Sequence, residues 1–379
     1  MSAKNNREFQ KLVDKYLDGA ATPEEQAVLD HYYLLFRDEP GYSESLNEKQ
    51  LAILEARMER HLFDRIKQSD KIKPLWPRIA AAASVLLVMG IGAHYLSKQK
   101  DQPQITVTHD VAPGTAVAIL KTGGRTIQLD HTANGLIAQQ NQTSITKTAG
   151  EKLAYTTGTN EASTPVYDTI MVPAGGRPYQ VVLSDGSKIT LNTATTLRYP
   201  QTFSKNRKEE IELISGEIYA EVVHKNAAPL KIKTTGQMIT DIGTSFNISA
   251  YADEPDARTT LIEGAVKINA LGKEILLSPG RQAIYTAHHL KDTAADIIQT
   301  TAWKNGLFRF NGERVDVIMR QLSRWYNIEV KYDGKITNEV FYARLTRNRN
   351  ISEVLKMLER TKKVQFKVEG RRVTVSSKS

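Results

Sequence analysis

The sequence predicts a multidomain protein with a small all-α bundle, one transmembrane helix, an all-β domain of solenoid-like or sandwich type, and a C-terminal α/β module of order βαββαββ. Three observations predict this fold class. Residues 79–96 form an uncharged apolar run, short strand-like runs with turn residues follow to about residue 300, and strand and helix periodicities alternate after residue 303. A chain of 379 residues has room for several such units.

Residues 1–75 are expected to form a helical bundle, because apolar residues recur at helical spacing along them. Thr22 fits the N-cap of the second helix, with Pro23 in its first turn and Glu25 completing a capping box. So small a bundle has a thin core, and the pattern fits a self-contained bundle and a bundle that packs on a partner helix equally well. The candidate partner-binding residues are Leu12, Tyr16, Leu29, Tyr33 and Phe36.

The apolar run at residues 79–96 predicts a transmembrane helix, which we assign to residues 76–97. Eighteen helical residues cover about 27 Å, close to the hydrocarbon thickness of a bilayer. Trp76 and Tyr95 flank the run, where amphipathic rings favour the headgroup region. A buried core helix is the alternative. Five Lys and Arg residues lie in 64–78 and two in 97–111, which predicts that the N-terminus is cytoplasmic and the rest of the chain lies outside the cytoplasm.

The charge of +9 is concentrated at the C-terminal end of the chain. Residues 303–379 hold 18 basic and 8 acidic residues, whereas residues 79–302 hold 20 of each and residues 1–78 hold 13 basic and 14 acidic. The chain has no cysteine, which excludes disulfides, thiolate catalysis and cysteine-based metal sites.

Residues 98–164 are expected to form a polar linker and a leading β segment, and residues 165–295 a β-domain. Two internal echoes support repeated β units. The run AILKTGGRTIQLD (118–130) echoes VVLSDGSKITLN (181–192), and LISGEIYAEV (213–222) echoes LIEGAVKINA (261–270) with Gly216 and Gly264 in matching places. Repeated short strands of this kind fit a stacked solenoid-like fold or a sandwich.

Several runs within this segment resemble, in order, the periplasmic domain of the FecR family of transmembrane sigma regulators. They are VPAGGRPYQVVLSDGSKITLNTATTLRYP (172–200), LISGEIYAEV (213–222), TDIGTSFNISAY (240–251), TLIEGAVKI (260–268) and LSPGRQAIY (277–285). The resemblance implies that the N-terminal part binds an extracytoplasmic-function sigma factor. It also implies that the periplasmic part receives a signal from a TonB-dependent outer-membrane transducer, and that proteolysis within the membrane frees the sigma factor.

Residues 303–376 are predicted to form the C-terminal module, with an amphipathic helix after Phe308 and a second helix capped by Asn350 and Glu353. The run WKNGLFRFNGERVDVIMRQLSRWYNIEV (303–330) resembles the small domain that follows FecR domains, which is similar to the short N-terminal domain of secretins and TonB-dependent transducers. The basic residues of this module fit a solvated face or a surface that meets an acidic transducer domain. They include Arg344, Arg347, Arg349, Arg371 and Arg372.

An RNA-binding module has a similar strand order, but the aromatic pattern of such modules is absent and the predicted topology keeps this part away from nucleic acid. We therefore expect no direct nucleic-acid binding, and no cofactor or metal site, because no histidine, phosphate-loop or nucleophile motif is present. The chain is not expected to be an enzyme. Some FecR-type regulators cleave themselves at a Gly-Thr bond, and Gly243-Thr244 resembles that place, but a tight turn before a strand explains the same pair without chemistry.

The leading hypothesis is a single-pass anti-sigma factor in the inner membrane of a Gram-negative bacterium. Its C-terminal region would be periplasmic, and it would control uptake genes for iron-siderophore complexes or glycans. The alternative hypothesis is a membrane-anchored periplasmic protein that binds carbohydrate or supports the envelope. Deletion of residues 1–75 separates the two, because it leaves the function intact only in the second.

Overall fold

The computed structural model describes residues 106–107, 109–140, 142–158, 165–203, 210–223, 229–335 and 337–377, together with Lys15 and Thr22. All of the ranges belong to one compact unit, Gln99–Ser379. Apart from Lys15 and Thr22, the predicted bundle lies outside the described residues, as does the whole predicted membrane span at residues 79–96. Among the described residues, no helix has the length and apolar character needed to cross a membrane.

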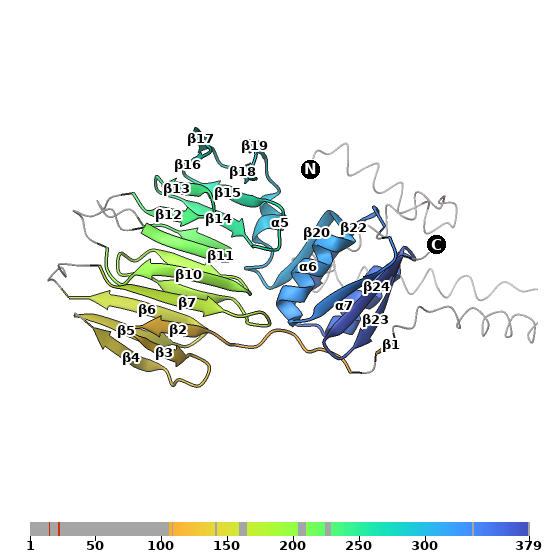
Figure 1. Cartoon of the computed structure of the whole chain (residues 1–379), viewed down its shortest axis with the longest axis horizontal. Coiled ribbons are helices and arrows are strands. Elements are labelled where there is room, and N and C mark those ends of the chain that lie inside the picture. Colours follow the sequence, from red (N-terminus) through yellow and green to blue (C-terminus); the bar gives the residue numbers. More distant parts are fainter. Residues whose placement is uncertain are drawn as a thin grey trace, which may run out of the picture. The chain divides into compact units, whose positions relative to one another are not determined.

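Strands β2–β19 form what we call the β-domain, and they pair into two faces (Figure 1). The first face has the order β3 (Arg125–Gln128), β2 (Ile119–Thr122), β7 (Tyr167–Val172), β10 (Thr195–Pro200), β11 (Glu210–Glu221), β12 (Lys231–Thr234), β13 (Gln237–Asp241), β16 (Val266–Ala270) and β17 (Lys273–Leu277). The second face has the order β4 (Gly135–Gln140), β5 (Thr143–Thr148), β6 (Lys152–Thr157), β8 (Tyr179–Val182), β9 (Lys188–Leu191), β11, β14 (Ser245–Ala250), β15 (Ala257–Glu263), β18 (Arg281–Tyr285) and β19 (Leu290–Ala294).

Strand β11 joins the two faces, because its first half pairs with β10 and β12 and its second half with β9 and β14. Alternate side chains of both faces, such as Leu120, Leu153 and Ile218, are buried in a single hydrophobic core. The prediction of a β-rich domain is confirmed.

The second sequence echo has a structural reason, since Gly216 and Gly264 both lie where the chain passes from one face to the other. Their φ angles are 119° and 87°, a region that side chains rarely adopt. A Cβ atom at Gly216 would lie 2.4 Å from Oγ1 of Thr195, and one at Gly264 would lie 2.1 Å from the carbonyl oxygen of Gly243. Both positions therefore require glycine.

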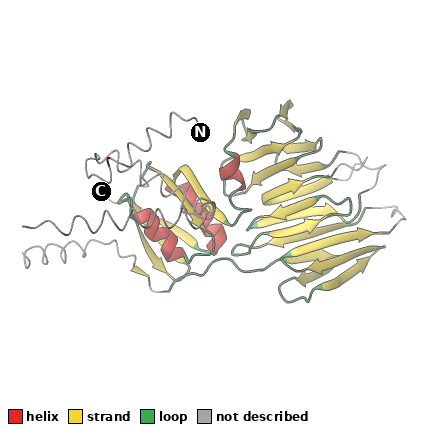
Figure 2. Ribbon diagram, turned by 180° about the vertical axis from the view of Figure 1, so that it is seen from behind, coloured by secondary structure: helices red, strands yellow, loops and turns green. Residues whose placement is uncertain are grey.

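The C-terminal module has the predicted order βαββαββ (Figure 2). Its elements are β20 (Leu307–Arg314), α6 (Val315–Tyr326), β21 (Glu329–Asp333), β22 (Val340–Thr346), α7 (Ile351–Glu359), β23 (Val364–Glu369) and β24 (Arg372–Ser377). Strands β20 and β22 pair with each other, and β24 pairs with β23 and β21 in a second sheet. The apolar faces of both helices fill a hydrophobic core separate from that of the β-domain. The short helix α5 (Ile297–Thr301) follows β19 and connects the two parts.

The segment before the β-domain is an integral part of the C-terminal module. Strand β1 (Thr106–Val107) pairs in parallel with β23, and Val111 is buried in the core of the module. The Asp110 carboxylate accepts hydrogen bonds from the backbone N–H of Ser352 at 3.1 Å and from its hydroxyl at 2.7 Å. Asn350 stands at the N-cap position of α7 as predicted, but its side chain makes no cap hydrogen bond, and Asp110 supplies the cap from far along the chain.

Candidate functional site

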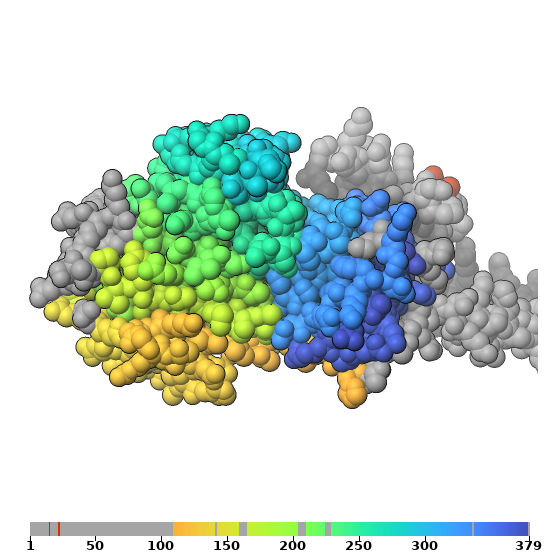
Figure 3. Space-filling model, in the orientation of Figure 1, coloured from red at the N-terminus to blue at the C-terminus, as the bar shows by residue number. Residues whose placement is uncertain are grey.

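The β-domain and the C-terminal module meet along a polar interface, which we call the seam (Figure 3). At one end of it, Arg324 on α6 donates from Nη1 to both carboxylate oxygens of Asp253 at 2.7 and 2.8 Å, and from Nη2 to Glu254 at 2.9 Å. Arg320, one turn earlier, reaches the other oxygen of Glu254 at 2.8 Å. The side chains of Arg324 and Glu254 are 10% and 16% exposed, so the bond between them is largely shielded from water, whereas Asp253 is 47% exposed.

Tyr251 ties the same helix to the β-domain a second time. The guanidinium of Arg324 lies 4.0 Å from the centre of the Tyr251 ring, and the Tyr251 hydroxyl donates to the carbonyl of Thr193 at 2.9 Å. The Thr193 hydroxyl in turn donates to the Arg324 carbonyl at 3.2 Å. Burial by itself would lower the pKa of Arg324, but Tyr251, Asp253 and Glu254 raise it, so the cation stays charged at any physiological pH.

A second network lies deeper in the seam. Glu217 on β11 accepts from Nδ2 of Asn192 at 2.7 Å and from Nδ2 of Asn247 at 3.0 Å. The Asn247 oxygen accepts from the Trp303 indole at 3.1 Å, which fixes the orientation of this amide. The Asn192 oxygen accepts from Nη1 of Arg347 at 3.0 Å. These bonds connect a strand of the β-domain to the loop after β22.

The surroundings shift the pKa values of both charged groups in this network, Glu217 and Arg347. Burial raises the pKa of Glu217, and the hydrogen bonds from Asn247 and Asn192 oppose that shift. Burial lowers the pKa of Arg347 to about 10, against the attraction of Glu217. Two opposite charges in a poorly solvated site stabilise each other, so removal of either one leaves the other unpaired.

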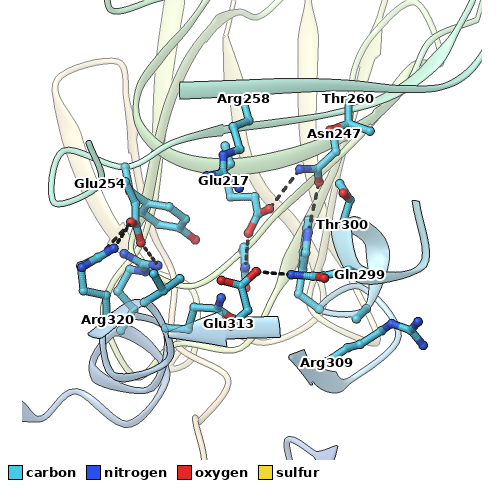
Figure 4. Close-up of a pocket in the computed structure, with 18 of the residues that line it drawn as sticks. Glu217, Asn247, Glu254, Arg258, Thr260, Gln299, Thr300, Arg309, Glu313 and Arg320 are labelled. Carbon is cyan, nitrogen blue, oxygen red and sulfur yellow. Dashed lines mark hydrogen bonds and ion pairs between the residues drawn. The ribbon is translucent and has the colours of Figure 1, made fainter. Parts of the chain in front are cut away.

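Between these networks lies a cavity of about 390 Å³ (Figure 4). Its walls come from strands β11, β14 and β15 of the β-domain and from α5, β20 and α6. Gln299 on α5 donates to Glu313 on β20 across one side, and Asp296 caps α5 by accepting from the backbone N–H of Gln299 at 2.9 Å. Most of the cavity lining is polar, with Leu307, Val317 and Trp303 among its apolar members, and many of the polar groups are held in place by their own hydrogen bonds. It can receive a small polar molecule.

The structure places the predicted pair Gly243-Thr244 in the turn between β13 and β14. Thr244 is 5% exposed, and its hydroxyl donates to the Asp241 carboxylate, which also accepts from the N–H of Gly243 at 3.1 Å. The carbonyl of Thr244 accepts from the N–H of Val222 at 3.0 Å. A carboxylate beside the hydroxyl is the arrangement that a proton-accepting base requires, and it also stabilises a tight turn.

The five predicted arginines do not form one surface. Arg344 is exposed on β22, and Arg349 is exposed before α7, where it pairs with Glu353. Arg371 and Arg372 are exposed at the turn between β23 and β24, in the other sheet. Arg347 is only 6% exposed and belongs to the seam, so it is not part of a solvated basic face. The predicted sigma-binding residues Leu12, Tyr16, Leu29, Tyr33 and Phe36 lie outside the described residues.

Residue spacing did not indicate the seam residues Glu217, Asn247 and Arg324. All three lie inside the quoted runs, Glu217 in LISGEIYAEV (213–222), Asn247 in TDIGTSFNISAY (240–251) and Arg324 in WKNGLFRFNGERVDVIMRQLSRWYNIEV (303–330). The available signal for Glu217 was its position directly after Gly216, the glycine at which β11 passes from one face to the other. Among the described residues, no group of three or more acidic, histidine or cysteine side chains could hold a metal ion.

Two protein families match this chain. The FecR protein family matches residues 168–267, and the FecR C-terminal family matches residues 307–375. These matches coincide with the core of the β-domain and with the C-terminal module. No curated protein shows significant similarity to the chain.

The fold is similar to that of two crystal structures of a candidate anti-sigma factor from Parabacteroides distasonis. In both, the sequences are 24% identical, the TM-score is 0.51, and the match covers 56% of this chain. It covers 100% of the relative's chain in one structure and 99% in the other.

Proposed function

We propose that this chain, which belongs to the FecR family, is a single-pass anti-sigma factor of the inner membrane. In this proposal residues 1–75 bind an extracytoplasmic-function sigma factor in the cytoplasm. The apolar run at residues 79–96 crosses the membrane, and the β-domain and C-terminal module form a periplasmic sensor. The observation that supports it most is the succession of a FecR domain and a FecR C-terminal domain after a hydrophobic span in one chain.

In this proposal the seam carries the signal from the C-terminal module to the β-domain. Arg320 and Arg324 fix α6 to the turn after β14, and the Glu217 network fixes the loop after β22 to β11. In addition, β1 pairs with β23, so the chain coming from the predicted span meets the C-terminal module before it enters the β-domain. A partner that moves the module therefore acts both on the β-domain and on the segment nearest the membrane.

The partner in this proposal is the signalling domain of a TonB-dependent outer-membrane transducer. The exposed residues Arg344, Arg349, Arg371 and Arg372 are its candidate contacts. After the signal arrives, an intramembrane protease releases the sigma factor, which then directs transcription of nutrient-uptake genes. The proposed role is regulatory and includes no catalytic turnover.

Co-purification of the full chain from membranes tests this proposal. Each extracytoplasmic-function sigma factor of the same genome is co-expressed with the tagged full chain, and the bound protein is identified after detergent extraction. A variant that lacks residues 1–75 but keeps the span is the control. Recovery of one sigma factor with the full chain and none with the control supports the proposal. Recovery of no sigma factor, or equal recovery with both chains, refutes it.

A further inference from the structure

The seam cavity has the size and the wall chemistry of a ligand site. Its volume of about 390 Å³ lies in the range of small-molecule pockets, which span about 300–1,000 Å³. Its lining includes five carboxylate and five guanidinium side chains, with no lysine or histidine. The formal charge of the wall is therefore zero, and the electric field favours neither a free anion nor a free cation.

Most of these charges already satisfy one another. Arg320 and Arg324 share Glu254, and Arg258 makes two bonds to Asp256 at 2.7 and 3.1 Å. A charged ligand would therefore have to displace an existing ion pair. An apolar ligand would remove water from the polar walls without replacing its hydrogen bonds, which costs free energy.

Two guanidinium groups of the wall still have unused donors. Among the described residues, Nε of Arg347 and Nε of Arg309 are buried and have no hydrogen-bond partner, and Nη2 of Arg309 lies 3.7 Å from Oδ2 of Asp296. Arg347 is 6% exposed, and the bond from Nη1 to Asn192 is its one side-chain hydrogen bond to another residue. A guanidinium has five donors, so this buried cation lacks acceptors that a ligand oxygen can provide.

The cavity lining also carries hydrogen-bond acceptors, the carboxylates of Glu217 and Glu313. Each oxygen of Glu217 accepts one amide hydrogen, and a carboxylate has about four acceptor positions, so further acceptor capacity remains. Glu313 accepts from Gln299 in the same way (Figure 4). A hydroxyl group can donate one hydrogen bond and accept others, so it suits a wall that carries both donors and acceptors.

We propose that the seam cavity binds a small neutral polyhydroxylated molecule, a free sugar or a polyol. Glu217 and Asn247 hold it from the β-domain, and Arg309 and Arg347 hold it from the C-terminal module. A ligand in this place contacts both parts and therefore stabilises the seam. This inference does not depend on sigma-factor binding. Sugar binding can therefore fail while the proposed function holds, and the proposed function can fail while sugar binding holds.

Titration calorimetry of the full chain tests the proposal, in a detergent without a sugar headgroup. The probes are glucose, xylose and maltose, with glucuronate as an acidic comparison, each up to about 50 mM. We expect saturable binding of at least one neutral sugar. Arg309→Ala should weaken it by about tenfold, the effect of one charge-assisted hydrogen bond. Gln299→Ala should weaken it as well, because Gln299 orients Glu313.

Arg198→Ala is the matched control, because this partly exposed arginine pairs with Glu212 on the β-domain, and it should bind as the wild type does. The proposal is overturned if no neutral sugar binds saturably, if only glucuronate binds, or if Arg309→Ala and Gln299→Ala leave the affinity unchanged.

Discussion

At the scale of single residues, Asp168 is a buried carboxyl group in the core of the β-domain. It is fully buried and accepts from the Tyr155 hydroxyl at 2.8 Å and from Nε2 of Gln201 at 3.0 Å. Burial raises the pKa of Asp168, and these hydrogen bonds only partly oppose the shift. The carboxyl group is therefore more easily ionised in the unfolded chain, where its pKa is about 4.

The sign of the pH dependence follows from this shift. The contribution of Asp168 to the free energy of unfolding is largest below about pH 4 and is lost as the pH rises through its folded-state pKa. Asp168→Asn cannot ionise, so its stability relative to the wild type should increase from about pH 4 to about pH 8. Urea unfolding of both proteins at the two pH values measures this difference. A relative stability that stays constant or falls with pH would show that the shift has the opposite sign.

Thr244 provides a second residue-scale prediction. If the chain cleaves itself at Gly243-Thr244, the Asp241 carboxylate beside the Thr244 hydroxyl is the proton acceptor. Purified full-length protein should then run as two fragments on a denaturing gel, and Thr244→Ala and Asp241→Asn should each run as one band. A single uncut band from the wild type would leave the turn with a structural role alone.

The burial of Arg347 could not be predicted from the sequence around it. Counting charges identified the C-terminal module as basic and placed Arg347 among solvated residues, because arginines are usually exposed. Its burial depends on Asn192 and Glu217, which are more than 100 residues away in the chain. No local pattern contains that information.

At the scale of elements, α7 depends on a cap supplied from before the β-domain. Asp110 accepts from the N–H and the hydroxyl of Ser352, whereas Asn350 at the N-cap position makes no such bond. Asp110→Ala should therefore lower the free energy of unfolding by about 1 kcal/mol, the usual value of an N-cap. Asn350→Ala is the matched control and should change it little. Thermal unfolding compares the two, and an equal loss in both would contradict the assignment.

The elements that the sequence predicted well are those with local signals. The order of strands and helices after residue 303 follows from periodicity, and the hairpin echoes correspond to β2–β3 and β8–β9. The pairing of β1 with β23 and the exchange of faces by β11 arise from contacts between distant segments. Such pairings depend on the whole fold, which is why the choice between a solenoid and a sandwich stayed open at the sequence level.

At the scale of the whole molecule, the proposed function requires that a bilayer separates residues 1–75 from the β-domain. In inverted inner-membrane vesicles, protease added from outside should remove residues 1–75 and leave a protected fragment that contains the β-domain and the C-terminal module. In intact spheroplasts the same protease should remove the β-domain and spare the N-terminal part. Digestion of both parts from the same side would contradict the predicted topology.

The proposed relay depends on the seam, in which Arg324, Asp253 and Glu254 connect the module to the β-domain. The most direct test is transcription from a promoter of the bound sigma factor, measured in cells with the full chain or with Arg324→Ala at equal membrane levels. Arg198→Ala is the control. We predict that Arg324→Ala changes the response to the inducing signal by about fivefold or more while the control behaves as the wild type. An unchanged response in Arg324→Ala would contradict a relay that passes through the seam.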